Sequence, residues 1–270
     1  MSTAVEIAQS RSSSAMYAGR PQVLLERSWL AFRSTTWVPI FTGFIEPVLF
    51  LLAFGYGMGN LVGNISVGSA SIDYTMFIAP GLLATSAMNG AVYDSTWNVF
   101  FKLNESKLYK TMLSTPLGPM DIALGEITCA LLRGLVYSIG FLTVVSVFGL
   151  TPSVWAVLAI PAASLVAFGF ASFGMAITSF FKTYQQMGFV TFVLLPMNLF
   201  SGSLYPISVY PDWLEKIIMA LPLWHGIELV RAFWFGNINS GILVHIFYFL
   251  IMIAVGLFVT SHRLRALFLR

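Results

Sequence analysis

The sequence predicts an all-α polytopic membrane protein, and three observations support this fold class. Hydrophobic residues make up 57% of the 270-residue chain and charged residues only 9%, with a mean hydropathy of +0.82. Soluble proteins carry about 25% charged residues. No Lys, Arg, Asp or Glu occurs between Gly134 and Phe181, whereas one bilayer crossing needs only about 20 residues. The apolar stretches also lack the two-residue alternation of a membrane barrel strand, so each is predicted to be a helix.

Six apolar stretches are each long enough to cross a bilayer and predict six transmembrane helices. Gly149 and Pro152 mark a turn between the third and fourth stretches. The fifth is short, which is consistent with a helix that is tilted or broken at Pro196. The predicted spans are residues 38–59, 74–98, 122–148, 154–180, 187–204 and 241–261.

The segment before the first span has two parts. Residues 1–19 are rich in Ser and Ala and lack an apolar core segment, which predicts a disordered tail and not a signal peptide. In residues 20–37, Leu25, Trp29, Phe32 and Thr36 have helical spacing, which predicts a helix lying in the membrane interface. The alternative is a simple lead-in to the first span.

The basic residues give the predicted helices an orientation. If both termini share a side, that side holds 11 of the 14 Lys and Arg residues. The positive-inside rule makes this side the cytoplasm. The tails, residues 1–19 and 266–270, and the charged loop 100–119 are therefore predicted to be cytoplasmic, and the segment 201–240 is predicted to lie outside.

Three ionisable residues, Glu46, Glu126 and Arg133, fall inside apolar stretches. A lone charge at the bilayer centre costs about 2.5–3.5 kcal/mol, so each should face protein, water or headgroups. Glu126 and Arg133 lie two turns apart on one helix face, roughly 10 Å by helix rise, so their interaction needs a third group or a water. Glu46 precedes Pro47, which predicts a bend or a new helix start that its carboxylate caps. A packing or headgroup role is the alternative for each.

A helical hairpin is predicted over residues 205–236, before the last span. Asp212 suits an N-cap, Pro222 interrupts the helix and Gly236 ends a second one. Aromatic residues in this segment suit the membrane interface, although an ordinary amphipathic surface loop is the alternative. The candidate residues of the hairpin are Trp213, Trp224, His225, Glu228 and Arg231.

Several function classes are excluded by what the sequence lacks. One cysteine, Cys129, and three scattered histidines form no disulfide framework and no convincing zinc or haem site, so Cys129 is assigned to helix packing. The sequence has no phosphate loop, no G-x-S-x-G elbow and no H-E-x-x-H pair. The net charge of +3 follows from membrane anchoring and gives no support for nucleic-acid binding. A transporter without a catalytic site of its own is therefore the predicted class.

Four strings resemble the membrane subunits of ABC type-2 exporters. They are "PGLLATSAMNGAVYDST", "YKTMLSTPLGPMDIALGEITCALLRG", "LFSGSLYPI" and "LPLWHGIELVR". The strings are most similar to permeases that export lipo-oligosaccharide nodulation factors, and less so to antibiotic-resistance and polysaccharide-export permeases. The resemblance covers about residues 20–265. Asp94 stands in the second span, where such permeases often carry an acidic residue.

The resemblance implies an ABC type-2 transmembrane domain over residues 20–265 in a bacterial inner membrane, with both termini cytoplasmic. It implies two ATPase subunits that bind the ATP and Mg, no cofactor in this chain, and a second permease copy or a homologous permease. The exported substrate would be amphipathic: a glycolipid, a lipid-linked oligosaccharide or polysaccharide, or a drug. Membrane lipids are further expected partners.

The resemblance also implies roles for particular residues. Loop 100–119 would contain a coupling helix that docks in the ATPase. Its apolar side chains would be the anchors and its charges the polar rim. The expected coupling residues are Lys107, Leu108, Tyr109, Met112 and Leu113, with Lys102, Glu105 and Lys110 also in the rim. Glu46, Asp94, Tyr205 and Pro206 would border the pathway or its outer gate.

Three alternatives stay open. Loop 100–119 could serve only as a positive-inside anchor of topology. The protein could be an ion-coupled secondary transporter in which Glu46, Asp94 or Glu126 carries a proton, although no inverted repeat is found in the sequence. A non-transporting scaffold or a membrane enzyme is the third class.

Overall fold

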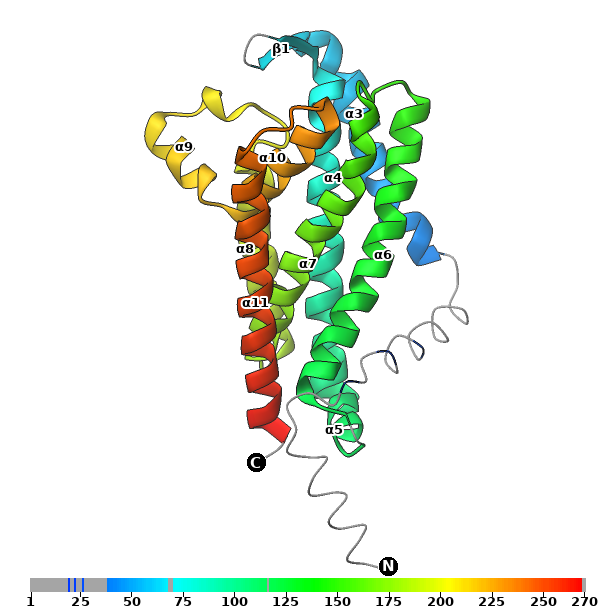
Figure 1. Cartoon of the computed structure of the whole chain (residues 1–270), viewed down its shortest axis with the longest axis vertical. Coiled ribbons are helices and arrows are strands. Elements are labelled where there is room, and N and C mark those ends of the chain that lie inside the picture. The colour runs from blue at the N-terminus through cyan, green and yellow to red at the C-terminus, as the bar shows by residue number, and fades with distance from the viewer. Residues whose placement is uncertain are drawn as a thin grey trace, which may run out of the picture.

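Each predicted apolar stretch contains a helix in the computed structural model, which describes residues 19, 22, 26, 38–67, 70–115 and 117–268 (Figure 1). The predicted interfacial helix and N-terminal tail lie outside the described residues, apart from Gly19, Gln22 and Glu26. The long helices are α3 (Val38–Val62), α4 (Tyr74–Tyr93), α6 (Pro119–Val147), α7 (Ala159–Thr178), α8 (Met187–Phe200) and α11 (Gly241–Phe268).

Two of these helices are extended by other helical turns. Two π-helical segments, η1 (Asp94–Asn98) and η2 (Phe101–Glu105), continue α4, so one helical element runs from Tyr74 to Glu105. The 3-10 turn η3 (Val154–Leu158) leads into α7. At the C-terminal end of the described chain, α11 continues to Phe268, so the first residues of the predicted tail are helical.

Four helical elements are long and apolar enough to cross a membrane: 74–105, 119–147, 154–178 and 241–268. In α3 the apolar segment with described side chains is the shorter Ile45–Gly59. Helix α8 has 14 residues, which corresponds to about 21 Å by helix rise against a hydrocarbon core of about 30 Å. The chain is therefore polytopic, and the count of six spans stays a prediction.

Three prolines lie inside helices that they do not end: Pro47 in α3, Pro80 in α4 and Pro196 in α8. Helix α3 runs through Pro47, and α8 runs through Pro196 to Phe200. Transmembrane helices tolerate proline because neighbouring groups can satisfy the freed backbone. Glu46 therefore lies within a continuous helix, and the prediction that its carboxylate caps a helix start is wrong.

Helix α7 lies at the centre of the bundle, between α4, α6 and α11, because small residues let other helices approach it closely. A Cβ atom built on Gly174 would lie 2.3 Å from Ser95 Oγ, next to the α4 extension. On α11, a Cβ atom on Gly256 would lie 2.6 Å from the carbonyl carbon of Ser172. The core around α7 therefore depends on these glycines.

Shorter elements occupy the two ends of the bundle (Figure 1). Helix α5 (Leu108–Leu113) lies at the end where α11 finishes, which we call the α5 end. The opposite end, which we call the α10 end, carries a hairpin of β1 (Asn64–Val67) and β2 (Ala70–Asp73). The strands pair antiparallel, from Asn64 opposite Asp73 to Val67 opposite Ala70. This β-hairpin was not predicted from the sequence.

The segment between α8 and α11 forms two helices at the α10 end. The 3-10 turn η5 (Ile207–Val209) precedes α9 (Asp212–Met219), and α10 (Pro222–Phe235) follows after Pro222. The two helices meet at a bend of 81°, so they form an L and not an antiparallel hairpin. Gly236 ends α10 with a φ of 72°, a left-handed conformation that glycine adopts without a Cβ clash.

Candidate functional site

Two ion pairs join the lower part of the second helix to α6. Arg133 Nη1 donates to Asp94 Oδ1 at 2.6 Å, and Lys102 Nζ donates to Glu126 Oε2 at 2.5 Å. Asn98 Nδ2, one turn beyond Asp94, donates to the same Oδ1 at 2.7 Å. Asp94 belongs to η1 and Lys102 to η2, whereas both partners belong to α6. We call the four charged residues the charge ladder.

The charge ladder lies within the bundle. The Glu126 side chain is 8% exposed and that of Asp94 is 12% exposed. Burying an unpaired charge in the hydrocarbon region would be costly, and a paired charge with further hydrogen bonds avoids much of that cost. The pairs therefore stabilise the packing of the α4 extension on α6.

Glu126 and Arg133 were predicted to interact through a third group, and the structure pairs each of them with a different partner. Two turns of one helix separate these two side chains, as the spacing indicated. Glu126 pairs with Lys102, and Arg133 pairs with Asp94. Both partners belong to the extension of α4. Helical spacing within α6 cannot reveal which helix lies beside it. Asp94 was expected to border the pathway, which stays a prediction, and within this chain its carboxylate accepts hydrogen bonds from Arg133 and Asn98.

The connection from the ladder to α5 is unusual in its backbone. Ser106 N donates to Phe101 O at 2.9 Å, an i to i+5 bond of the π type. Lys107 follows with a φ of 49° and a ψ of 27°. Among the described residues it is the only non-glycine residue with positive φ. Such a conformation typically costs about 1–3 kcal/mol and is common at functional sites.

The apolar side chains of helix α5 are buried against the rest of the protein. Tyr109 is 0% exposed, and Met112 and Leu113 are also buried. These three side chains therefore cannot be free anchors for an ATPase cleft, and that expectation needs correction. An amphipathic helix predicts one buried face, but its sequence does not say whether the core or a partner buries it. The exposed side carries Lys107, Lys110, Thr111 and Ser114, while Leu108 is half-buried.

A second polar centre lies at the α10 end, around Arg231 of α10. Its Nη1 donates to Glu228 Oε1 at 2.6 Å, and its Nη2 donates to the Gly202 carbonyl at 2.9 Å. The guanidinium carbon lies 4.4 Å from the ring centroid of Phe77 on α4, a cation–π contact. Arg231 thus clamps the turn after α8 to α10 and α4. The sequence placed Arg231 in a surface hairpin, whereas its side chain is only 12% exposed.

A histidine of α10, His225, pairs with a histidine of α11, His245. His225 Nδ1 and His245 Nδ1 are 2.8 Å apart, so one ring donates and the other accepts. Trp224 makes edge contacts with both rings, and Tyr248 stacks on His225 with centroids 4.2 Å apart. These contacts fasten α10 to the last helix. Trp224 and His225 were candidates from the sequence, whereas His245 and Tyr248 were missed because they lie in an otherwise apolar stretch.

The remaining predicted residues lie apart from both centres. Glu46 is exposed on α3, and Trp213 is 65% exposed on α9. Tyr205 is 42% exposed and Pro206 half-buried in the turn at the α10 end. The second helix begins at Tyr74, next to the β1–β2 hairpin of the α10 end. Asp94 lies about 30 Å further along this helix, by helix rise, and is therefore far from that end. The predicted pathway residues are therefore not brought together within one chain.

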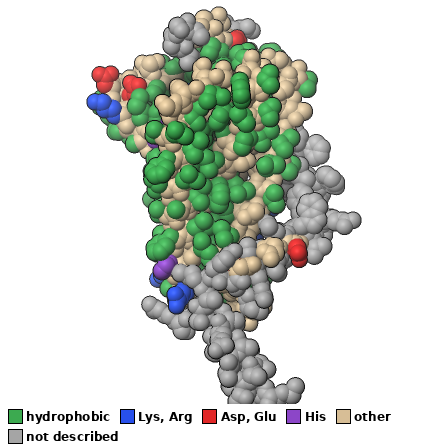
Figure 2. All heavy atoms as spheres, in the orientation of Figure 1, with side chains coloured by type: hydrophobic (Ala, Val, Ile, Leu, Met, Phe, Trp, Pro, Cys, Tyr) green, Lys and Arg blue, Asp and Glu red, His purple; other side chains and the backbone are tan. Residues whose placement is uncertain are grey.

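Large apolar surfaces remain uncovered on the bundle. Figure 2 shows hydrophobic side chains over the middle of one face and charged side chains toward its ends. Helix α8 buries only Met187 and Met197, while Phe189, Phe192 and Leu195 are more than 60% exposed. Such a surface suits lipid or a further protein chain.

Comparisons with known proteins agree with the resemblance seen in the sequence. Residues 21–235 match the family described as ABC-2 type transporter. Nodulation protein J of Rhizobium leguminosarum bv. viciae is 30% identical over 245 residues, which cover 90% of this chain and 93% of the relative. Nodulation protein J of Sinorhizobium fredii is 31% identical over 82% of this chain and 83% of its own length. The inner membrane transport permease YadH of Escherichia coli is 27% identical over 79% of this chain and 83% of its own length.

Proposed function

Because the chain belongs to the ABC-2 type transporter family, we propose that it is the membrane subunit of an ATP-driven exporter. The observation that carries this proposal is the connection between α5 and the bundle. One helical element runs from the α10 end through η1 and η2, and α5 follows directly after Lys107. The charge ladder ties the same element to α6. A displacement of α5 would therefore be transmitted to both the second helix and α6.

In this proposal α5 is the coupling helix, with its two faces in different roles from those that the sequence suggested. The buried residues Tyr109, Met112 and Leu113 hold α5 against its own chain. The exposed residues Lys107 and Lys110 meet the ATPase subunit. Buried apolar contacts give a stiff connection, and exposed charges give orientation and partner choice.

A second permease chain, identical or homologous, completes the pathway in this proposal, and each chain binds one ATPase subunit that holds the ATP and Mg. Two features support a partner beside α3 and α8. Helix α8 leaves most of its side chains uncovered. Glu46 is an exposed carboxylate in an apolar helix, and such a charge is unfavourable against lipid, so it would face the partner or a water-filled pathway. The pathway would then lie between the first, second and fifth helices of both chains.

The proposed cargo is amphipathic, and export is the proposed direction. The relatives named nodulation protein J and the general similarity to export permeases suggest a glycolipid, a lipid-linked oligosaccharide or polysaccharide, or a drug. The proposed location is the bacterial inner membrane, with the α5 end and both termini in the cytoplasm. The basic residues of that end support this orientation.

The charge ladder gives no support to the alternative of an ion-coupled transporter. Asp94 and Glu126 were two of the three candidate proton carriers. Each accepts a hydrogen bond from a cationic side chain of the neighbouring helix, so both carboxylates have a structural role that joins the second helix to α6.

The proposal is tested by reconstituting the chain with its ATPase subunit in vesicles. We expect ATP hydrolysis that depends on the permease, and co-purification of the two subunits. The variant Lys107→Glu with Lys110→Glu should weaken co-purification most at low salt, because it reverses two exposed charges. Lys216→Glu, an exposed lysine on α9, is the matched control and should leave co-purification unchanged.

Two outcomes would contradict the proposal. One is transport by the purified chain alone when a proton gradient is present and ATP is absent. The other is normal ATPase association and stimulation by the Lys107 and Lys110 double variant, which would leave α5 as a topology anchor. Membrane insertion of each variant is measured in parallel, so that a misfolded protein is not mistaken for an uncoupled one.

A further inference from the structure

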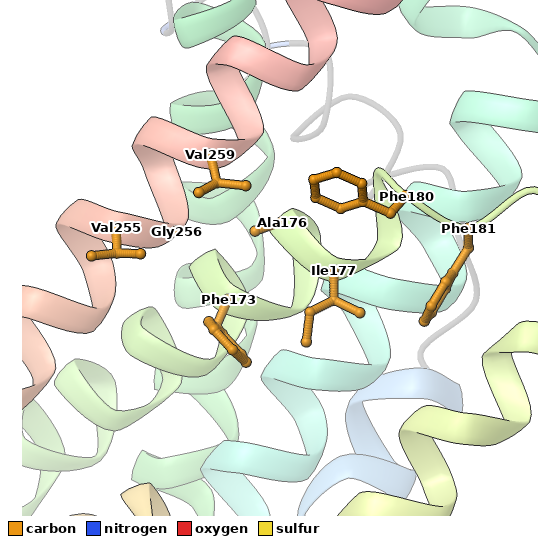
Figure 3. Close-up of a pocket in the computed structure, with 8 residues that line it drawn as sticks. All are labelled: Phe173, Ala176, Ile177, Phe180, Phe181, Val255, Gly256 and Val259. Carbon is orange, nitrogen blue, oxygen red and sulfur yellow. The ribbon is translucent and has the colours of Figure 1, made fainter.

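A groove lies between α7 and α11 in the part of the bundle near the α5 end (Figure 3). It has a volume of about 280 Å³, and every side chain that lines it is hydrocarbon. Phe173, Phe180 and Val255 stand at its rim, each about half exposed. The lining residues are Phe173, Ala176, Ile177, Phe180, Phe181, Val255, Gly256 and Val259.

The shape of the groove follows from residue sizes. Ala176 and Gly256 are small and buried, so they leave space at the floor. The aromatic rings of Phe173 and Phe180 rise from α7 and the turn after it, and Val255 and Val259 rise from α11 (Figure 3). An open slot of this kind in a membrane protein has no polar group to hold water, so a hydrocarbon chain is the favourable occupant.

A cationic residue stands at one end of the groove. Arg263 follows Val259 by one helical turn on the same face of α11. Its guanidinium carbon lies 4.8 Å from the ring centroid of Phe180, and its Nε donates to the Ser179 carbonyl at 3.4 Å. None of the three ion pairs within the described part of the chain involves Arg263. The terminal nitrogens of the guanidinium are therefore held beside the groove with no carboxylate on them from described residues.

Two further exposed cations lie in the neighbouring sequence. Lys182 directly follows the groove residue Phe181, and Arg265 belongs to the last turn of α11. An apolar slot that ends at a fixed cation with more positive charge nearby is complementary to a molecule with a long hydrocarbon chain and an anionic head. Guanidinium groups bind phosphate oxygens with paired hydrogen bonds, and basic pockets between helices bind anionic lipid headgroups.

We propose that this groove is a binding site for one anionic glycerophospholipid. An acyl chain fills the slot between α7 and α11, and the phosphate lies on Arg263. The site lies on different helices from the proposed pathway and is separate from the exported cargo. Binding itself does not depend on the proposed transport function. Which leaflet supplies the lipid does depend on the proposed orientation.

The test counts lipids on the purified, delipidated full chain by native mass spectrometry. The chain is titrated with dioleoylphosphatidylglycerol and, separately, with dioleoylphosphatidylcholine. We expect one phosphatidylglycerol molecule to bind preferentially. Arg263→Gln should weaken that binding about fivefold, the usual effect of one basic residue near an anionic headgroup. Arg263→Lys should retain most of it.

Three further variants make the result specific. Ala176→Trp fills the groove from α7 and Val259→Trp fills it from α11, and each should abolish the preferential binding while the melting temperature shows that the protein is folded. Arg265→Gln removes a charge of the same kind at an exposed position and should have a smaller effect than Arg263→Gln. Equal effects of the two arginine variants, equal binding of the two lipids, or retention of binding in both folded tryptophan variants would overturn the proposal.

Discussion

At the residue scale, the most informative features are side chains whose partners come from other helices. Their place inside an apolar stretch identified Glu126 and Arg133 as charges in need of partners, whereas the family resemblance singled out Asp94 and Lys102 for other roles. The sequence could not match them, because each match depends on which helix packs beside α6. The same is true of Arg231, whose contacts with Gly202 and Phe77 join three segments that are distant in sequence.

The charge ladder predicts coupling between particular residues. Glu126→Gln should destabilise the protein because it leaves the Lys102 ammonium without its partner. Adding Lys102→Gln should recover part of the lost stability. The coupling free energy between the two residues is expected to be about 0.5–3 kcal/mol. The coupling free energy is obtained from the free energies of unfolding of the unaltered protein, the two single variants and the double variant, all measured in detergent.

A second cycle, in which Arg133→Gln is combined with Glu126→Gln, is the control. These two residues belong to separate ion pairs, so their coupling should be smaller than that of Glu126 with Lys102. A stronger coupling of Glu126 with Arg133 would contradict the pairing in the structure.

Replacing the Arg231 side chain is predicted to lower the stability of the protein. Arg231→Met keeps much of the side-chain length but removes both hydrogen bonds and leaves Glu228 without its cation. We expect a loss of about 1.5–3 kcal/mol in stability, typical of hydrogen bonds to a charged group, because Glu228 is 33% exposed and can be hydrated. Thermal unfolding measures the loss, and Lys216→Met on the exposed face of α9 should have little effect. Similar unfolding temperatures for the two variants would show that Arg231 is not a clamp.

At the element scale, the helices were predictable and their partners were not. Long apolar runs dominate the sequence, so the positions of α3, α4, α6, α7 and α11 agree with the predicted spans. The β1–β2 hairpin was missed because two strands of four residues give too short a pattern. Helix α5 was expected, but the direction of its apolar face was not, since a partner and the core both favour apolar residues.

The close approach of α7 and α11 predicts the effect of one added methyl group. Gly256→Ala should destabilise the bundle by about 1–3 kcal/mol, because the new Cβ would meet the backbone of Ser172. Helix propensity alone predicts the opposite, since alanine is the better helix former. Gly188→Ala on α8, where a Cβ meets nothing within 4 Å, is the matched control and should be neutral or stabilising. Equal melting temperatures for the two variants would contradict the packing described above.

At the scale of the whole molecule, the two ends of the bundle predict two labelling patterns. Single cysteines at Asn64 and Asn237, in a chain with Cys129→Ala, should react with an impermeant thiol reagent in intact cells. Cysteines at Ser114 and His262 should react only after the membrane is permeabilised. All four positions are exposed in the structure, so the side of the membrane, and not burial, decides whether each cysteine reacts. The reverse pattern would place α5 outside and remove the basis for coupling to a cytoplasmic ATPase.

The assembly is the part of the molecule that one chain reveals least. Hydropathy and charge predicted a polytopic bundle, because burial in lipid imposes those patterns on every span. A pathway between two chains leaves no comparable pattern. Its traces are indirect: an exposed carboxylate at Glu46, an uncovered α8, and predicted pathway residues that do not meet within one chain.

The order of signs in the charge ladder restricts how motion can pass through the molecule. Along the second helix the signs run negative at Asp94 and positive at Lys102, and on α6 they run negative at Glu126 and positive at Arg133. Because the helices are antiparallel, sliding one past the other by a rung would bring Lys102 opposite Arg133, or Asp94 opposite Glu126. Like charges would then face each other in a poorly hydrated place. A slip by one rung is therefore unfavourable, so in the proposed coupling the second helix and α6 would tilt or rotate together as one unit.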